Sequence, residues 1–175
     1  MSEKENKQIP VKVELSVKVD GKEVFKKTDD LLTKWFNRFM TVFISTIKLS
    51  LKKLDGTDVS IPSIAYYTDF RIFNKIAIGL DNTSPTGSDY NLKNTYMTTT
   101  TLSNRVVQET DNYIILDSSA NFSFTEDKTI YEFGLIGYGA GIEFLACRDV
   151  VPEGISVSNG QVLTITYRFI IGTYP

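Results

Sequence analysis

The sequence predicts a mainly β protein, an antiparallel β-sandwich with one amphipathic helix near its N-terminus. Apolar and polar residues alternate strictly over residues 11–19, which is the period-two pattern of a strand with one buried and one solvated face. In the second half of the chain, short apolar segments follow one another at roughly ten-residue spacing with turn signals between them, as they do in β-sandwiches. Residues 30–47 instead repeat their apolar side chains at three- and four-residue intervals, which is typical of a helix.

The chain begins with a polar, charged segment, residues 1–10, in which we expect a flexible N-terminal arm. The strand at 11–19 comes next. Asp20-Gly21 follows it, a pair that is favoured in tight hairpin turns, and residues 23–27 are expected to return as the partner strand. The first element of the domain is therefore predicted to be a β-hairpin.

The predicted helix at about residues 30–47 has an unusually aromatic apolar stripe. Thr28, Asp29 and Asp30 offer capping oxygens at its start. We expect this stripe to pack onto a sheet of its own domain, and the alternative is that part of it docks against a neighbouring subunit. The candidate subunit contacts are Trp35, Phe36, Phe39 and Phe43, together with Tyr138.

The rest of the chain is predicted to form short strands that complete a single domain over residues 11–175, a length that suffices for one hydrophobic core. A polar loop is expected at 81–89 and a glycine-rich hairpin tip at 137–141. The expected extended segments are 66–80, the Thr-rich stretch 96–107, a hairpin of 113–116 with 121–124 around Asp117-Ser118-Ser119, and the strands 130–136, 143–151 and 162–171.

Composition excludes several classes of function. The chain has no histidine, which excludes Ser-His-Asp and Cys-His nucleophiles and His-ligated zinc. Cys147 is the only cysteine and lies in an apolar run, so we expect a small buried residue rather than a disulfide or a reactive thiol. A net charge of −2 disfavours a strongly basic nucleic-acid binder, and the apolar segment at 30–47 is too interrupted by polar residues for a membrane span.

One pair of charged residues, Glu132 and Arg148, is the main candidate for a site. Glu132 stands between Tyr131 and Phe133 in an otherwise apolar strand. A buried carboxylate needs partners, so we expect it to accept hydrogen bonds from backbone amides or to pair with Arg148. Structural bracing by Glu132 and Arg148 is favoured over catalysis. The sequence predicts no catalytic residue, no metal site and no cofactor.

Several short motifs in the second half of the chain occur in a known order. They are Ile78-Gly79-Leu80 with Asp89-Tyr90-Asn91-Leu92, Ile130-Tyr131-Glu132-Phe133-Gly134-Leu135, Phe144-Leu145-Ala146-Cys147-Arg148-Asp149-Val150, and a Ser158-Asn159-Gly160 turn before Leu163-Thr164-Ile165-Thr166-Tyr167. Over roughly residues 76–171, this order resembles small virion structural proteins of tailed phages and archaeal viruses. The resemblance implies a jelly-roll-like sandwich that assembles with copies of itself, and it brings no catalytic residues with it.

We therefore expect a non-enzymatic virion structural protein, a capsid decoration, vertex or tail component. It would form homo-oligomers, contact other virion proteins, and reach the virion after assembly in the host cytoplasm. Neither nucleic acid nor a membrane is an expected partner. The alternative is a carbohydrate-binding β-sandwich module used for surface recognition, with a host-surface glycan as its ligand. Its candidate stacking platforms are the loop tyrosines Tyr66, Tyr67, Tyr90, Tyr96 and Tyr138.

Overall fold

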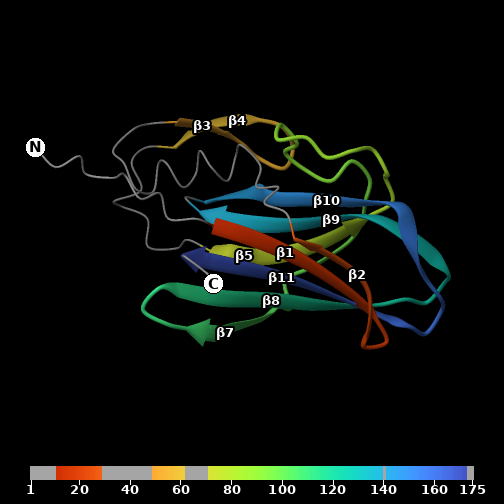
Figure 1. The fold of residues 1–175 in the computed structure, drawn as a ribbon. Coiled ribbons are helices and arrows are strands. Elements are labelled where there is room, and N and C mark those ends of the chain that lie inside the picture. Colours follow the sequence, from red (N-terminus) through yellow and green to blue (C-terminus); the bar gives the residue numbers. More distant parts are fainter. Residues whose placement is uncertain (1–10, 29–48, 62–70, 140, 173–175) are drawn as a thin grey trace, which may run out of the picture.

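The computed structural model describes residues 11–28, 49–61, 71–139 and 141–172 (Figure 1). Within these ranges the chain forms β-strands and no helix. The strands are β1 (Val11–Val19), β2 (Lys22–Thr28), β3 (Leu49–Lys52), β4 (Asp58–Ile61), β5 (Arg71–Gly79), β6 (Thr95–Thr99), β7 (Ser103–Glu109), β8 (Tyr113–Ser123), β9 (Lys128–Gly139), β10 (Ile142–Val157) and β11 (Val162–Gly172). The predicted arm at 1–10 and the predicted helix at 30–47 lie outside the described residues. The same part of the chain contains no helix with the length and hydrophobicity of a membrane crossing.

Two antiparallel sheets form the body of the molecule, which confirms the prediction of a mainly β protein. The five-stranded sheet has the order β2-β1-β11-β8-β7, and the four-stranded sheet has the order β10-β9-β5-β6. The first and last strands are neighbours, because β1 pairs with β11 from Val11↔Ile171 to Val19↔Leu163. The two sheets pack face to face as a sandwich, and the small β3–β4 sheet lies beyond the four-stranded one (Figure 1).

The β1–β2 hairpin forms as the sequence predicts. Asp20 and Gly21 both adopt positive φ angles, 48° and 79°. Two consecutive residues in this region are the requirement of the type I′ turn, whose twist matches that of the flanking strands.

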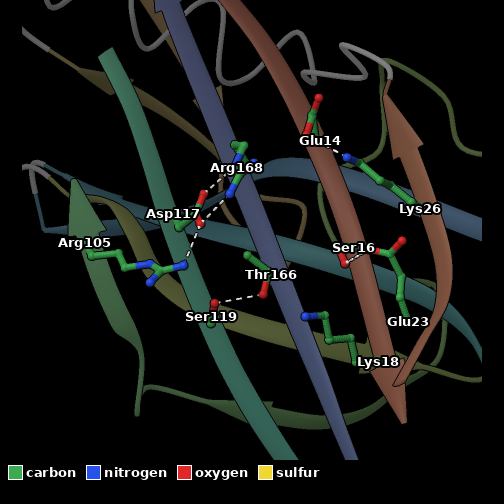
Figure 2. Close-up of a pocket in the computed structure, with 10 residues that line it drawn as sticks. All are labelled: Glu14, Ser16, Lys18, Glu23, Lys26, Arg105, Asp117, Ser119, Thr166 and Arg168. Atoms are coloured by element: carbon green, nitrogen blue, oxygen red, sulfur yellow. Dashed lines mark hydrogen bonds and ion pairs between the residues drawn. The ribbon is translucent and has the colours of Figure 1, made fainter. Parts of the chain in front are cut away.

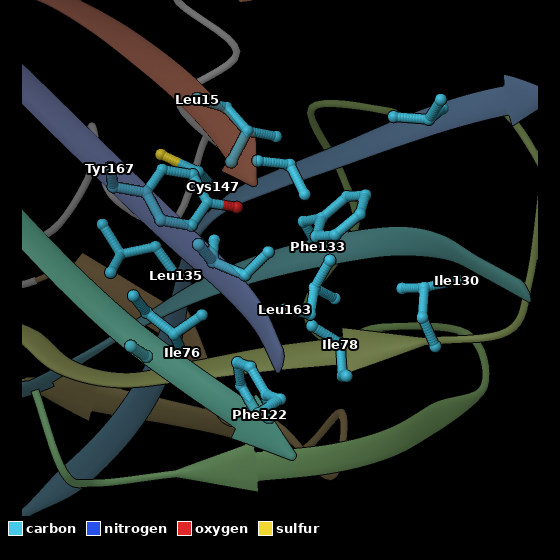
Figure 3. Packing of buried hydrophobic residues seen from close by; sticks show 14 of the residues in the cluster. Leu15, Ile76, Ile78, Phe122, Ile130, Phe133, Leu135, Cys147, Leu163 and Tyr167 are labelled. Carbon is cyan, nitrogen blue, oxygen red and sulfur yellow. The ribbon is translucent and has the colours of Figure 1, made fainter. Parts of the chain in front are cut away.

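The core lies between the two sheets and is built from the inward positions of both (Figure 3). In β1 and β11, every second residue is buried, as the alternation of apolar and polar residues predicts. The largest fully buried side chains include Tyr167 and Phe169 from the five-stranded sheet and Phe133, Phe144, Ile76 and Ile78 from the four-stranded sheet.

The outer face of the four-stranded sheet is covered by the segment that joins β5 to β6, residues 80–94, called the covering loop below. Leu92 of this loop packs with Ile136 and Leu145 of the sheet and with Leu54 of the β3–β4 turn. Gly134 permits the approach, because a Cβ atom at this position would lie 2.2 Å from the Leu92 Cδ1 atom. Both faces of this sheet are therefore buried.

One prediction of local structure was wrong. The proposed hairpin around Asp117 is one continuous strand, β8. Asp117 fits inside a sheet because arginines on both neighbouring strands pair with it. The Thr-rich segment 96–107 is mostly extended, as predicted, but it forms two strands, β6 and β7, which belong to different sheets. The expected hairpin tip at 137–141 also begins later, since residues up to Gly139 belong to β9.

Both edge strands of the five-stranded sheet carry a β-bulge at an exposed valine. In β2 the register shifts at Val24, which is 48% exposed, and in β7 it shifts at Val107, which is 41% exposed. A bulge twists an edge strand and interrupts its row of unpaired backbone groups, so it disfavours the addition of a further strand. Contacts of this sheet with other molecules are therefore better made through its outer face than through its edges.

Candidate functional site: the polar face of the five-stranded sheet

Two clusters of polar side chains stand out, one buried and one open to solvent. The buried cluster centres on Glu132 of β9 and Arg148 of β10, whose side chains are inaccessible to solvent. The Arg148 Nε atom donates to the Glu132 Oε2 atom at 3.0 Å, and Nη2 lies 2.9 Å from the same oxygen. The two residues predicted to form a pair are therefore in direct contact on the outer face of the four-stranded sheet.

Arg148 also reaches the covering loop. Its Nη1 atom donates to the Thr83 carbonyl oxygen at 3.1 Å and to the Asp89 Oδ2 atom at 3.0 Å. Its Nη2 atom lies 3.4 Å from the Asp81 Oδ1 atom. One guanidinium group thus binds the loop at three points while it pairs with the sheet beneath.

The Glu132 carboxylate binds both ends of the same loop. It accepts the backbone N–H of Asp81 at 3.3 Å, that of Lys93 at 2.9 Å and that of Asn94 at 2.7 Å. Backbone amides and one guanidinium group supply the hydrogen bonds that a buried carboxylate needs. The pair thus connects the covering loop to the sheet. Its bracing role stays a prediction that unfolding measurements test.

Asp89 is the second buried carboxylate of this cluster. Burial alone would raise its pKa, but hydrogen bonds from Thr86 and Lys93 and the charge of Arg148 outweigh burial and hold the pKa below the ordinary value. Asp89 is therefore an anion at neutral pH and holds no proton there to donate in acid catalysis.

The second cluster is a polar hollow of about 170 Å³ on the outer face of the five-stranded sheet (Figure 2). Its side chains form three rows that run across the strands, because outward-facing residues of paired strands stand side by side. The charged row contains Glu14, Arg168, Asp117 and Arg105. The hydroxyl row contains Ser16, Thr166 and Ser119. The lysine row contains Lys18, Thr164 and Asn121, with Glu23 of β2 opposite Lys18.

The hydroxyl row is the floor of the hollow. Ser119 and Thr166 share a hydrogen bond of 2.8 Å between their hydroxyl oxygens, and Ser16 donates to the Glu23 Oε2 atom at 2.9 Å. These side chains are short, whereas the side chains of the charged row on one side and of Lys18 on the other side are long. The depression therefore results from side-chain length alone.

The charged row is a chain of alternating charges centred on Asp117. Arg168 donates to both carboxylate oxygens of Asp117, at 2.8 and 2.9 Å, and the Arg105 Nη2 atom lies 3.4 Å away. Burial would raise the pKa of Asp117, but the hydrogen bonds and charges of these two arginines hold it below the ordinary value. Asp117 is thus an anion at neutral pH. At its far end, the Lys26 Nζ atom lies 3.5 Å from a carboxylate oxygen of Glu14.

Lys18 differs from the other cations of the hollow. Its exposed side chain extends from β1 toward β11 (Figure 2). Among the described residues, it has no ion-pair or hydrogen-bond partner. A cation without a partner beside three hydroxyl groups can bind a carboxylate or another acceptor from a second molecule.

The described residues offer little else on which chemistry could be built. They contain no group of carboxylates or thiols with the geometry of a metal site. None of the described residues that line the hollow is aromatic, so a sugar ring would find no stacking platform there. Tyr96 is instead stacked on Phe124, with ring centroids 6.2 Å apart, and Tyr90 is 38% exposed on the covering loop, away from the hollow.

The remaining residues that the sequence singled out are distributed as follows. Tyr138 is half-buried in β9, where it faces Glu143 of β10 and Arg71 of β5. Outside the described residues lie the aromatic candidates Trp35, Phe36, Phe39 and Phe43 and the loop tyrosines Tyr66 and Tyr67.

Sequence reasoning missed the polar face as a unit. Alternation in β1 and β11 does identify Ser16 and Thr166 as outward-facing. Their adjacency depends on the pairing of the first strand with the last, and no local signal in the sequence reveals it.

Comparisons with known proteins found no match to this chain among family models, curated proteins or solved structures.

Proposed function

We propose that this chain is a non-enzymatic structural protein of a virus particle, which self-assembles and contacts other particle proteins. As a capsid decoration, vertex or tail component, it would be assembled in the host cytoplasm and retained in the virion. The order of sequence motifs over residues 76–171 supports this function. The way in which the polar groups are used supports it further.

The observation that carries the proposal is that the buried charges hold strands and loops together. Each buried charged side chain among the described residues has an ion-pair partner of opposite sign: Arg148 with Glu132 and Asp89, Asp117 with Arg168, and Asp149 with Lys27. Catalytic carboxylates are typically poised for proton transfer or attack at a cleft. In this chain the buried carboxylates accept hydrogen bonds from their neighbours, which favours a structural role over a catalytic one.

A jelly-roll-like connectivity is the finer part of the proposal. The chain passes from one large sheet to the other between β6 and β7, between β8 and β9, and between β10 and β11, which is the feature shared with jelly rolls. The pairs β7–β8 and β9–β10 remain hairpins within one sheet. We therefore propose a jelly-roll-like sandwich in which some neighbouring strands are also joined as hairpins within one sheet.

The test is whether the chain is part of a particle. A culture that expresses the gene from its native genome is fractionated on a density gradient, and the fractions are analysed by mass spectrometry. We expect the chain to sediment with particle nucleic acid, at a constant ratio to the other particle proteins across the peak. Recovery from the soluble fractions alone would contradict the proposal, and glycan binding by that soluble protein would then favour the carbohydrate-binding alternative.

A further inference from the structure

The polar face has an arrangement of charges that is complementary to itself. Glu14 and Lys18 lie on the same strand, one in the charged row and one in the lysine row, at equal distances from the hydroxyl row between them. They are four positions apart, so they stand about 13 Å from each other along the strand. A two-fold axis along the hydroxyl row exchanges their positions.

We propose that the outer face of the five-stranded sheet is a contact between two copies of this chain, related by a two-fold axis along the hydroxyl row. The inference rests on the proposed function, because it names the partner through which the protein self-assembles. In this contact, Glu14 of each copy faces the partner's Lys18. The cation that has no ion pair among the described residues of its own chain thereby gains a carboxylate.

The remaining residues of the three rows fit the same axis. Ser16, Thr166 and Ser119 would lie against their own counterparts, and a hydroxyl group both donates and accepts, so identical hydroxyls can bond to one another. Arg168 would face the partner's Thr164, a neutral residue of the lysine row. Lys26 of β2 stands opposite Ser16 at the end of the hydroxyl row, so it would lie close to its own copy at the rim, where its long side chain can turn toward solvent.

The alternative axis, along the strands through β11, is unfavourable. It would bring Glu14 opposite the partner's Asp117 and Arg168 opposite its own counterpart, so that like charges would meet in both places. Charges of the same sign that face each other across an interface suppress that mode of association. The pattern of charges therefore selects one two-fold arrangement.

The size of the face sets the expected strength of the contact. The part of the face that carries the rows extends about 13 Å along the strands, and the five strands of the sheet are about 19 Å across, so contact over this face buries on the order of 500 Å² in total. Stable complexes bury at least about 1,200 Å². We therefore expect a weak, salt-sensitive dimer in solution, of the kind that many simultaneous contacts reinforce in a particle.

Charge exchange tests this contact. Sedimentation equilibrium of the full chain, at low and high salt, compares wild type with Glu14→Lys, Lys18→Glu and the double variant that carries both changes. Each single change should weaken self-association by roughly tenfold, because two ion pairs per dimer become repulsive. The double variant restores both pairs in reversed orientation and should recover wild-type association.

Matched controls separate this contact from a general effect of charge. Glu153→Lys reverses an exposed glutamate of β10, and Lys22→Glu reverses an exposed lysine of β2; both should leave self-association unchanged. Circular dichroism checks that every variant is folded. If Glu14→Lys does not fold, Lys18→Glu alone still tests the contact, because it changes only an exposed side chain. Single variants that associate like wild type, a double variant that fails to recover, or a wild-type chain that stays monomeric up to the order of 1 mM would each overturn the inference.

The outcome is independent of the gradient experiment. If the chain sediments with particles but charge exchange has no effect on self-association, the inference fails and the proposed function stands. If charge exchange behaves as expected but the chain is absent from particles, the contact between copies stands and the virion function fails.

Discussion

Arg148 stands at the centre of the buried cluster of charged side chains. Its guanidinium group pairs with the fully buried Glu132 and with Asp89, which is 3% exposed. Removal of one partner from a buried ion pair leaves the other charged groups without compensation, which typically costs about 3–5 kcal/mol. We therefore expect Arg148→Met to lower the free energy of unfolding by about 3–5 kcal/mol, as measured by urea denaturation.

Arg105 provides the control for this prediction. It also pairs with a buried aspartate, Asp117, but its own side chain is 68% exposed and Asp117 keeps the bidentate pair with Arg168. Arg105→Met should therefore cost less than about 1 kcal/mol. Equal losses in the two variants would contradict the bracing role of Arg148.

Asp89 and Asp117 give the protein a defined response to acid. The pKa of each is lower in the folded chain than the ordinary value, since hydrogen bonds and arginine charges outweigh the effect of burial. As the pH falls, these two carboxylates therefore take up protons first in the unfolded chain. Their stabilisation of the fold is complete above their pKa in the unfolded chain and is lost as the pH falls through their pKa in the folded chain. Urea denaturation should show the free energy of unfolding falling between about pH 5 and pH 3.

The double variant Asp89→Asn/Asp117→Asn isolates this contribution. It should be less stable than wild type at neutral pH, because the charge-assisted contacts of both carboxylates are lost. Its stability should also depend less on pH in the acid range. A wild-type chain that becomes more stable between about pH 5 and pH 3 would show that its carboxylates take up protons more readily in the folded state than in the unfolded state, contrary to this prediction.

At the scale of elements, the covering loop depends on close approach at Gly79. A Cβ atom at this position would lie 2.5 Å from a carboxylate oxygen of Glu132 and 2.6 Å from the backbone oxygen of Asn94. Because a backbone atom cannot swing aside, Gly79→Ala should push the loop away from the sheet and cost about 1–3 kcal/mol. Thermal denaturation measures the loss, and limited proteolysis should show faster cleavage within residues 80–94.

Gly87 is the matched control in the same loop. A Cβ atom there would meet no other atom within 4 Å, and its φ angle is one that other residues adopt. Gly87→Ala should therefore leave stability within about 0.5 kcal/mol of wild type or raise it slightly. Similar losses for both alanine variants would mean that the close approach at Gly79 is not the cause of the loss there.

The elements that local pattern predicts well are those whose folding is decided locally. The β1–β2 hairpin is one, since β1 alternates regularly and Asp20-Gly21 supplies the turn. The strand β8 is the opposite case. Its central Asp117 is a residue typical of turns, and a strand accommodates it because it pairs with Arg105 and with Arg168, which is 51 residues away in the chain.

The same reasoning explains which parts of the candidate site were predictable. A lone glutamate in an apolar strand predicts a partner, and Arg148 is the partner found for Glu132. The contribution of Asp89 was not predictable, because it depends on how the covering loop folds back onto the sheet. The polar face likewise depends on the β1–β11 pairing, which brings together residues from the two ends of the chain.

At the scale of the whole molecule, the two sheets should separate only in global unfolding. Cys147 reports on this, because it lies in the core between the sheets at 1% exposure, next to residues of both (Figure 3). Burial and the nearby charge of Asp149 raise the pKa of its thiol well above the usual range. Thiolate is the reactive form, so the native thiol should be inert to a thiol reagent.

We therefore expect labelling of Cys147 by Ellman's reagent to require unfolding of the sandwich. In increasing urea, the free energy of opening obtained from the labelling rate should equal the free energy of unfolding obtained from circular dichroism, because one cooperative event exposes the thiol. The chain unfolded in guanidinium gives the reference rate of the free thiol. Fast labelling without denaturant, or a rate insensitive to urea, would show instead that β10 opens locally while the rest of the sandwich stays folded.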